Sequence, residues 1–436
     1  MQSLEIIVVS PYSPKWSNIG SIRWEKLAKY LSKRHKVTLI TSAFLEKGYE
    51  RSYDIGNANL IEVPLKFYWK NPYTLSKQNT HEYNSRISFL RKLKAELRVP
   101  LERIFPISSG GMLYHDMNSY KRKIEELISK EKTKVLITTY DPWFTLKLGN
   151  YFKRRYENLV WIADFRDLSF SDQGSILSKL PIFRIQTKKI LEPADLITVV
   201  TKHMQWIYAE LTEKRVMFLP NGYDGNLFFE GNLSKIKKEN CLSIAYTGSL
   251  HPRTREISCF VTVLEKVTTI SPQVKLNFNY AGLQADIVES EFSKRRLGKL
   301  LNNHGFLKRD QALELQKQAD ILLLIAYTGD DPETGKSIRT GKVYEYLASG
   351  KPILAIAPRD WELKEEIECD GVSKVFDKNQ IDEMAQYLVD LARRQKIEIN
   401  FQKRKEVIEK YLYKNLALQL ERELESLVRE RERDQL

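Results

Sequence analysis

The residues with the clearest capacity for chemistry lie in the second half of the chain, just after an apolar run. Leu242–Tyr246 is predicted to be a strand, and it is followed by a glycine, a serine and two arginines: Gly248, Ser249, Arg253 and Arg255. Glycine lets a ligand approach the backbone, and a guanidinium can donate two parallel hydrogen bonds to phosphate oxygens. The pattern indicates an anion pocket, with a tight turn carrying exposed arginines as the alternative.

A later loop and helix carry a second set of candidate residues. Thr340 and Gly341 precede a predicted helix whose first turn holds Lys342, and Glu345 follows three residues later on the same helical face. The lysine and the free N–H groups of the helix start could hold phosphates, and the carboxylate could accept both hydroxyls of a ribose. The alternative is a surface ion pair between Lys342 and Glu345, which would contribute little.

Two further motifs give weaker indications of phosphate binding. Gly20 precedes the first predicted helix, near 21–34, but a single glycine without the GxGxxG spacing is a weak motif. The sequence DDPETGKS, at 330–337, imitates a P-loop, yet Asp330 stands at its first glycine position. Acidic side chains would occupy a loop that needs N–H donors, so we reject the P-loop interpretation.

The elements that must position these residues alternate between strands and helices in two separate stretches. The first stretch has predicted strands at 5–10, 36–41, 59–63, 135–139, 159–163, 196–201 and 216–219, and the second at 242–246, 274–280, 321–325 and 352–357. Alternation of this kind predicts parallel sheets covered by helices on both faces. The fold class is therefore α/β, with two domains of this type.

Turn formers and charges mark the boundary between the two stretches. We expect an N-terminal domain at 1–222, a linker at 223–240 and a C-terminal domain at 241–397. From 398 to 436 the mixed three- and four-residue spacing of apolar side chains predicts one long charged helix, from about 401, that packs back toward the N-terminal domain.

Bulk composition limits the classes of function. The chain has 436 residues, a formal charge of +14 and only three cysteines without metal-ligand spacing. No run is long and apolar enough to span a membrane, and no signal peptide is apparent, so we expect a cytoplasmic protein. The positive charge favours an anionic partner, but the absence of an aromatic and basic strand motif argues against nucleic acid.

One basic segment, 76–106, does not fit the alternation of strands and helices. Its apolar residues lie on one face of a predicted helix with arginines and lysines around them. Such a helix could contact an anionic membrane on its inner face, where each cation is worth about 1 kcal/mol. We slightly favour the alternative, an insertion packed on its own domain.

Taken together, these segments resemble the GT-B glycosyltransferases, specifically the retaining family 4 group. The resemblance covers nearly the whole chain and rests on SPYSPKWSNIGSIRWEKLAKYL, WIADFRD, ADLITVVT, LPNGYD, AYTGSLHPR, HGFLKRDQALELQKQADILLL and GKVYEYLASGKPILA. It implies two Rossmann-like domains with a deep cleft between them. It also implies that the N-terminal domain binds the acceptor and the C-terminal domain binds a nucleotide-sugar donor.

The resemblance assigns roles where the motifs match. Glu345 stands where the family binds the donor ribose, and the nucleobase would meet the main chain of Gly305, Phe306 and Leu307. The diphosphate would meet Gly20, Gly248, Gly341 and Lys342, with Arg253 or Arg255 near the family's phosphate-binding lysine.

Departures from the family pattern concern the sugar and the acceptor. Ser337 replaces the family's first glutamate, and Ser249 stands where arginine is frequent, so we expect Lys342 to supply that charge. The family's N-terminal histidine has no counterpart in TTYDPWFTL, where Asp141 and Thr145 lie. Asp164, Arg166 and Asp167 are the remaining polar cluster, for which we predict catalysis or acceptor binding, with a structural role as the alternative.

The sequence therefore predicts a retaining hexosyltransferase that needs neither metal nor cofactor. No Asp-x-Asp tripeptide is present to hold a donor's metal. We expect a UDP-hexose such as UDP-glucose as donor, and a glycan or lipid-linked acceptor of surface polysaccharide synthesis. The alternatives are a sugar-nucleotide epimerase or hydrolase on the same fold and, more remotely, a basic nucleic-acid-binding protein.

Overall fold

The computed structural model describes residues 3–16, 19–43, 51–68, 97, 100–108, 113–128, 134–170, 177, 180–225, 238–251, 254–336 and 338–434. The chain forms two compact units. Unit 1 comprises Met1–Asn221 and Tyr413–Leu436, and unit 2 comprises Gly222–Leu412.

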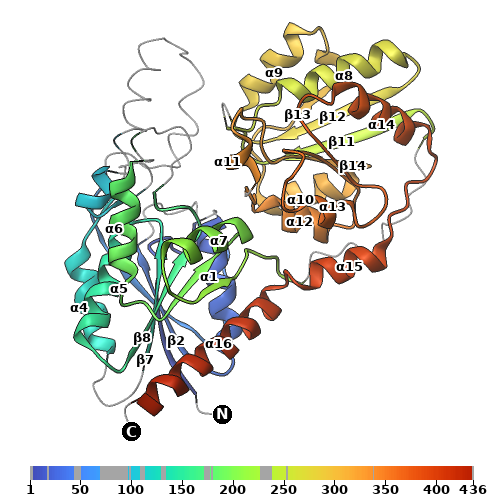
Figure 1. Ribbon diagram of the computed structural model, residues 1–436. Coiled ribbons are helices and arrows are strands. Elements are labelled where there is room, and N and C mark those ends of the chain that lie inside the picture. Colours follow the sequence, from blue (N-terminus) through green and yellow to red (C-terminus); the bar gives the residue numbers. More distant parts are fainter. Residues whose placement is uncertain are drawn as a thin grey trace. The chain divides into compact units, whose positions relative to one another are not determined.

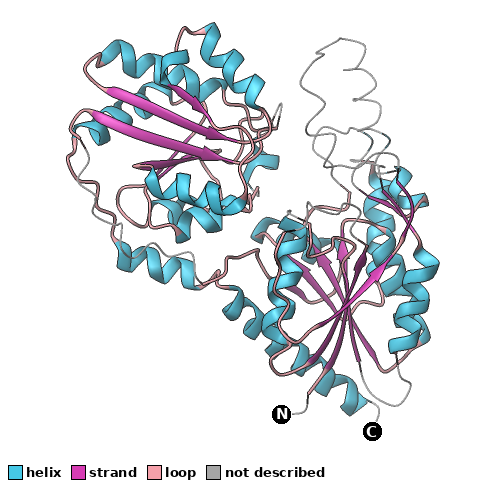
Figure 2. Ribbon diagram, turned by 180° about the vertical axis from the view of Figure 1, so that it is seen from behind, coloured by secondary structure: helices cyan, strands magenta, loops and turns pink. Residues whose placement is uncertain are grey.

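Unit 1 is built on a seven-stranded parallel sheet (Figures 1 and 2). Its spatial order is β3–β2–β1–β7–β8–β9–β10, so the chain starts in the middle and fills first one side and then the other. The strands are β1 (Glu5–Val9), β2 (Lys36–Ser42), β3 (Asn59–Val63), β7 (Lys134–Tyr140), β8 (Leu159–Phe165), β9 (Leu196–Val199) and β10 (Val216–Phe218). The five inner strands are short, apolar and almost wholly buried, as expected for strands covered on both faces, whereas the edge strands β3 and β10 are only partly buried.

Helices cover both faces of this sheet. Side chains of α1 (Ile19–Leu31) and α16 (Tyr413–Asp434) share one apolar core with the sheet. The other core holds side chains of α4 (Met117–Leu127), α5 (Phe144–Arg155), α6 (Pro181–Leu191) and α7 (Lys202–Leu211). A small antiparallel sheet of β4 (Leu65–Tyr68), β6 (Leu113–His115) and β5 (Ile107–Ser108) was not expected from the sequence.

Unit 2 repeats the design with six parallel strands in the order β13–β12–β11–β14–β15–β16. These are β11 (Cys241–Thr247), β12 (Lys275–Ala281), β13 (Leu301–Asn303), β14 (Ile321–Ile325), β15 (Ile353–Ile356) and β16 (Lys374–Phe376). One face is covered by α8 (Ser258–Ile270), α9 (Ala285–Lys294) and α14 (Ile381–Arg393). The other face is covered by α10 (Arg309–Gln318), α12 (Lys342–Ala348), α13 (Lys364–Glu368) and α15 (Phe401–Glu409).

The C-terminal segment is not the single long helix expected from its apolar spacing. It forms α15 and α16, separated at 410–412, where the backbone N–H of Tyr223 donates to the carbonyl of Tyr411 over 3.0 Å. A carbonyl that pairs with another segment at this point ends one helix before the next begins. Consequently α15 belongs to unit 2 and α16 to unit 1.

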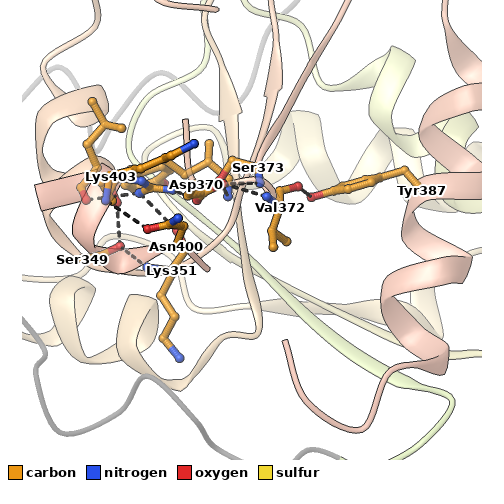
Figure 3. Close-up of polar contacts among 12 residues, drawn as sticks. Ser349, Lys351, Asp370, Val372, Ser373, Tyr387, Asn400 and Lys403 are labelled. Carbon is orange, nitrogen blue, oxygen red and sulfur yellow. Dashed lines mark hydrogen bonds and ion pairs between the residues drawn. The ribbon is translucent and has the colours of Figure 1, made fainter. Parts of the chain in front are cut away.

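A buried ion pair fixes α15 to unit 2. The guanidinium of Arg404 contacts Asp370, and both side chains are completely buried. Asp370 also accepts from the Ser373 hydroxyl at 2.7 Å, while its backbone carbonyl accepts from the N–H of Asn400 at 2.9 Å (Figure 3). Because the Asp370 carboxylate accepts from Arg404, from the Ser373 hydroxyl and from two backbone N–H groups, its charge is compensated and the pair is tolerated in the interior.

Both sheets confirm the expected fold class of two Rossmann-like domains. The strands found by sequence patterns agree with the structure to within one or two residues at most ends. In the described part of the two parallel sheets, only the three-residue strands β13 and β16 were missed, in addition to the small sheet of β4, β5 and β6. Within the part of the chain that is described, no helix combines the length and apolar character needed to cross a bilayer.

Candidate functional site

The strand order of each unit marks where a ligand should bind. In open parallel sheets, ligands bind outside the carboxyl ends of the strands, at the point where the winding direction reverses. That point lies between β1 and β7 in unit 1, and between β11 and β14 in unit 2. In each unit a ligand is therefore expected at the carboxyl edge of the sheet, next to these two strands.

In unit 2 the loop after β11 is shaped around Gly248. Its φ of +116° is a conformation that side chains rarely adopt, and its N–H donates to the carbonyl of Ala281 at 2.7 Å. A Cβ built at Gly248 would lie 3.0 Å from the Nζ of Lys342, although the two residues are 94 positions apart in the sequence. The structure thus brings two of the predicted phosphate-binding residues into contact.

Lys342 is held over an aromatic ring. Its Nζ donates to the hydroxyl of Tyr246 at 2.8 Å and lies 3.9 Å from the centre of that ring. Tyr246 in turn donates to the carbonyl of Ser249 at 2.9 Å. Burial, and then the nearby charge of Arg255, lower the pKa of Lys342 well below its usual value, although Glu345 opposes the shift. A group in this position is stabilised in its charged form by an incoming anion.

A second cation of this edge, Arg255, lies in the loop that leads to α8. Arg255 forms a backbone bridge with His251, and burial lowers the pKa of Arg255. Burial, followed by Arg255 and Lys342, lowers the pKa of His251 to about 4, so the imidazole is neutral at pH 7. Arg253, which was predicted to share this role, lies outside the described residues.

The helix start predicted to meet the diphosphate is also at this edge. Gly341 is the N-cap of α12, and Lys342 is its first helical residue. Thr340 is buried, and its hydroxyl oxygen finds no hydrogen-bond partner in the described structure. A buried hydroxyl without a partner is costly, and a bound ligand would relieve that cost.

The segment predicted to meet the nucleobase, 305–307, packs beside Gly248 through Gly282, a residue that was not predicted from the sequence. The N–H of Gly282 donates to the carbonyl of Gly305 at 2.8 Å, and a Cβ at Gly282 would lie 2.3 Å from the carbonyl oxygen of Gly248. The ends of β11, β12 and β13 are therefore in close contact. Beyond Gly305, Phe306 is 69% exposed and Leu307 is partly buried.

Glu345 does not pair with Lys342, so the surface pair considered from the sequence is not what the structure contains. Its carboxylate is 2.6 Å from the guanidinium of Arg309, the first residue of α10, and both side chains are partly exposed. A ribose that bound Glu345 would have to compete with Arg309 for the carboxylate. Arg309 was not predicted as a site residue.

In unit 1, Asp164 is completely enclosed by donors. Arg23 contacts one oxygen at 2.8 Å, and Trp24 donates to the other at 2.8 Å. Thr139 and Thr198 donate at 3.1 and 2.7 Å. Burial would raise the pKa of Asp164, but Arg23 and the hydrogen bonds outweigh it and lower the pKa. Its surroundings favour the structural alternative, in which it ties α1 to three strands.

A second polar group lies at the switch point itself and was only partly recognised from the sequence. The hydroxyl of Tyr12, which follows β1, donates to Asp141, which follows β7, at 3.0 Å. Arg166, just beyond β8, donates to the carbonyl of Asp141 at 3.1 Å, and its guanidinium lies 4.8 Å from the centre of the Tyr12 ring. Asp167 is exposed beside it, whereas Gly20 is buried within the first turn of α1.

One described cluster has the composition of a metal site: His35, Glu421 and Glu425. The backbone N–H of Leu4 donates to Nδ1 of His35 at 3.2 Å, and Nε2 faces Glu421 at 2.9 Å. Arg34 is also 2.9 Å from Glu421. Nδ1 of His35 is already engaged as an acceptor, and the cluster lies at the amino ends of β1 and β2, away from the switch point.

This architecture is shared with proteins of known structure. The sequence matches no protein-family model and no curated protein. Solved structures do match over the full length, among them sucrose-phosphate synthase from Thermosynechococcus elongatus, with a TM-score of 0.61, 13% identity, and coverage of 97% of this chain and 99% of that one. A glycosyltransferase from Rickettsia africae gives 0.60 and 15% identity, with coverage of 98% and 99%.

A third match is HepE from Anabaena, solved in complex with UDP-glucose, with a TM-score of 0.59, 12% identity, and coverage of 97% and 100%. Identities this low show the fold and not the activity. The chain therefore has the GT-B architecture, shared with known glycosyltransferases, as the sequence resemblance implied. Membership of the retaining family 4 group stays a prediction.

Proposed function

We propose that this protein is a glycosyltransferase that uses a nucleotide-sugar donor. The observation that carries the proposal is the contact between Lys342 and Gly248 at the switch point of unit 2, with Arg255 close by. A lysine and an arginine beside a glycine, whose missing side chain allows close approach, form a site for a diphosphate. A diphosphate leaving group is what a nucleotide-sugar transferase must stabilise.

The donor would lie along the carboxyl edge of unit 2. Its diphosphate would contact Gly248, Ser249, Arg255 and Lys342. The backbone N–H of Gly341 and the hydroxyl of Thr340 would lie beside it. Its ribose would bind Glu345 in exchange for Arg309, and its base would meet Gly305, Phe306 and Leu307. Fixed charges and dipoles of this kind commonly supply the largest share of catalysis, with one lost donor costing about 3–4 kcal/mol.

The acceptor would bind at the carboxyl edge of unit 1. Arg166 and Asp167 are candidates for contact with it, together with Asp141 and Tyr12. Asp164, with both oxygens occupied, would position α1 and β8 and would not touch the substrate. We further propose that transfer retains configuration without metal, with the departing phosphate accepting the acceptor's proton, so that no separate base is needed.

The donor class is proposed as UDP-hexose, and the acceptor as a glycan or lipid-linked glycan of surface polysaccharide synthesis. The donor proposal is supported by HepE, a structural neighbour that was solved with UDP-glucose. The acceptor proposal is supported by the net charge of +14, which suits phosphorylated or membrane-borne partners.

A thermal-shift screen tests the proposal directly. UDP-, GDP-, ADP- and dTDP-sugars would be compared, and we expect one nucleotide class, UDP, to raise the melting temperature. Titration calorimetry would then compare the wild type with Lys342→Ala/Glu345→Ala, for which donor affinity should be almost lost. A wild type that binds no nucleotide sugar, or a double variant with unchanged affinity, would exclude the proposed donor site.

A further inference from the structure

Exposed apolar side chains in unit 1 are concentrated on two short stretches. Of the fifteen large apolar side chains that are exposed in the described structure, eight lie at 97–105 or 177–185. They are Leu97, Leu101, Ile104, Phe105, Leu177, Leu180, Ile182 and Ile185. Scattered apolar residues on a surface need no explanation, but a concentration of this size indicates an interaction face.

The helical turn at 100–104 has an inverted pattern of burial. Its charged residues point inward, since Glu102 is 2% and Arg103 is 9% exposed, whereas Ile104 is 66% exposed. The Arg103 guanidinium stacks on Trp143 with 3.3 Å to the ring centre, and burial lowers the pKa of Arg103 to about 10. A surface that buries its charges and exposes its isoleucine is not arranged for contact with water alone.

The helix α6 lies against this turn and continues the pattern. Arg103 donates to the hydroxyl of Thr187 at 3.2 Å and lies 5.6 Å from the Phe183 ring, so the two helical segments adjoin. Phe183 and Thr187 face inward, while Ile182 and Ile185 are 48% and 60% exposed. In Figure 1, α6 lies with α4 and α5 in the helical layer on one face of the unit 1 sheet.

The charged side chains on α6 are all positive. The helix α6 has no acidic residue, and Arg184, Lys188 and Lys189 are exposed on it. A second copy of the same face would bring cations against cations, so this charge distribution opposes self-association through it. Apolar side chains that can enter the acyl boundary, flanked by cations, match a bilayer surface with anionic headgroups.

We propose that the face formed by 100–105 and α6 docks unit 1 on an anionic lipid bilayer. This differs from the expectation drawn from the sequence, in which the basic residues of 76–106 make the contact. Most of that segment lies outside the described residues, and its Arg103 is turned into the protein. The proposal does not depend on the nucleotide site of unit 2.

Vesicle flotation of the full-length protein tests this docking face. Vesicles of phosphatidylglycerol and phosphatidylcholine in equal amounts would be compared with phosphatidylcholine alone, and we expect binding to the anionic vesicles only. Ile182→Ser/Ile185→Ser should lower the bound fraction at least tenfold. Lys188→Gln/Lys189→Gln should lower affinity about thirtyfold, with a weaker dependence on salt, because each cation near the surface contributes about 1 kcal/mol.

Matched controls come from unit 2. Ile270→Ser removes another exposed apolar side chain, and Lys275→Gln/Lys299→Gln removes the same charge from exposed positions. Both controls should bind vesicles as the wild type does, and all variants should keep their melting temperature and nucleotide affinity.

Three results would overturn the docking proposal. The first is a wild type that ignores anionic vesicles. The second is an equal loss in the unit 2 controls. The third is an Ile182→Ser/Ile185→Ser variant that changes the oligomeric state in light scattering and keeps vesicle binding, which would assign the face to a second copy of the chain.

Discussion

The two units share a strand order but differ in the chemistry at the equivalent edge. In unit 2 the edge carries a lysine with a lowered pKa, an arginine and a neutral histidine around a glycine. In unit 1 the edge carries Asp141, whose carboxylate accepts from Tyr12 and whose backbone carbonyl accepts from Arg166. The first arrangement suits an anion, and the second suits hydroxyl groups that both donate and accept hydrogen bonds.

The comparison also separates two kinds of buried charge. Asp164 in unit 1 is completely buried and satisfied by its neighbours, so nothing is left for a ligand. Lys342 in unit 2 has a neutral hydroxyl and a ring as partners, and the nearby Arg255 repels it. A charge that is already balanced builds the fold, whereas a charge held without its counter-ion is available to a ligand.

The largest expected effect tests the structural role of Asp164. Asp164→Asn leaves Arg23 buried without a counter-ion, which should cost about 3–5 kcal/mol of unfolding free energy. Urea unfolding would measure this loss. The exposed Asp167→Asn is the matched control and should change stability by about 0.5 kcal/mol. A stable Asp164→Asn variant that binds donor normally but transfers no sugar would move Asp164 into the catalytic group.

The next effect concerns Lys342, for which the described residues of unit 2 provide no ion-pair partner. Lys342→Met should weaken nucleotide diphosphate binding about 100-fold, because a charge-assisted contact worth about 3 kcal/mol is removed. Calorimetric titration with UDP measures it. Lys336→Met removes a lysine of the same unit that pairs with Asp360 at 2.7 Å, and its affinity should match the wild type. Equal losses in both variants would mean that overall charge, not the site, attracts the nucleotide.

A smaller effect should appear as a dependence on pH. Burial lowers the pKa of Lys342 in the free protein, and a bound diphosphate would raise it again, so binding should take up a proton. Affinity should then fall as pH rises between that lowered pKa and the ordinary lysine value of 10.5. Calorimetry in buffers of different ionisation enthalpy measures the uptake. Lys342→Arg should abolish it, since arginine stays charged.

The fold was largely predictable because both sheets are buried on both faces. Strands such as β7 and β14 are continuous apolar runs bounded by polar residues, a pattern that the sequence shows plainly. The strand β13 is Leu-Asn-Asn and has no such pattern, since it is an edge strand that exists through its pairing with β12. The break between α15 and α16 depends on Tyr223, nearly 190 residues earlier.

The candidate residues of unit 2 could be selected from the sequence more readily than those of unit 1. Gly248 and Lys342 belong to local motifs that a sequence displays. Tyr12, Asp141 and Arg166 follow three different strands, and only the strand order β1–β7–β8 brings them together. Asp164 looks the same in sequence as a catalytic aspartate, because the donors around it come from α1 and from strands on either side.

The smallest expected effect concerns the ion pair that occupies the proposed ribose position. Arg309→Ala removes the partner of Glu345, and since both side chains are partly exposed, stability should change by less than about 1 kcal/mol. Because the ribose would no longer compete with the guanidinium, UDP affinity should rise a few-fold, and calorimetry would detect this change. Arg309→Ala/Glu345→Ala is the control and should lose the gain. A fall in affinity for Arg309→Ala alone would instead show that Arg309 contacts the nucleotide itself, which would add a cation to the anion-binding edge of unit 2.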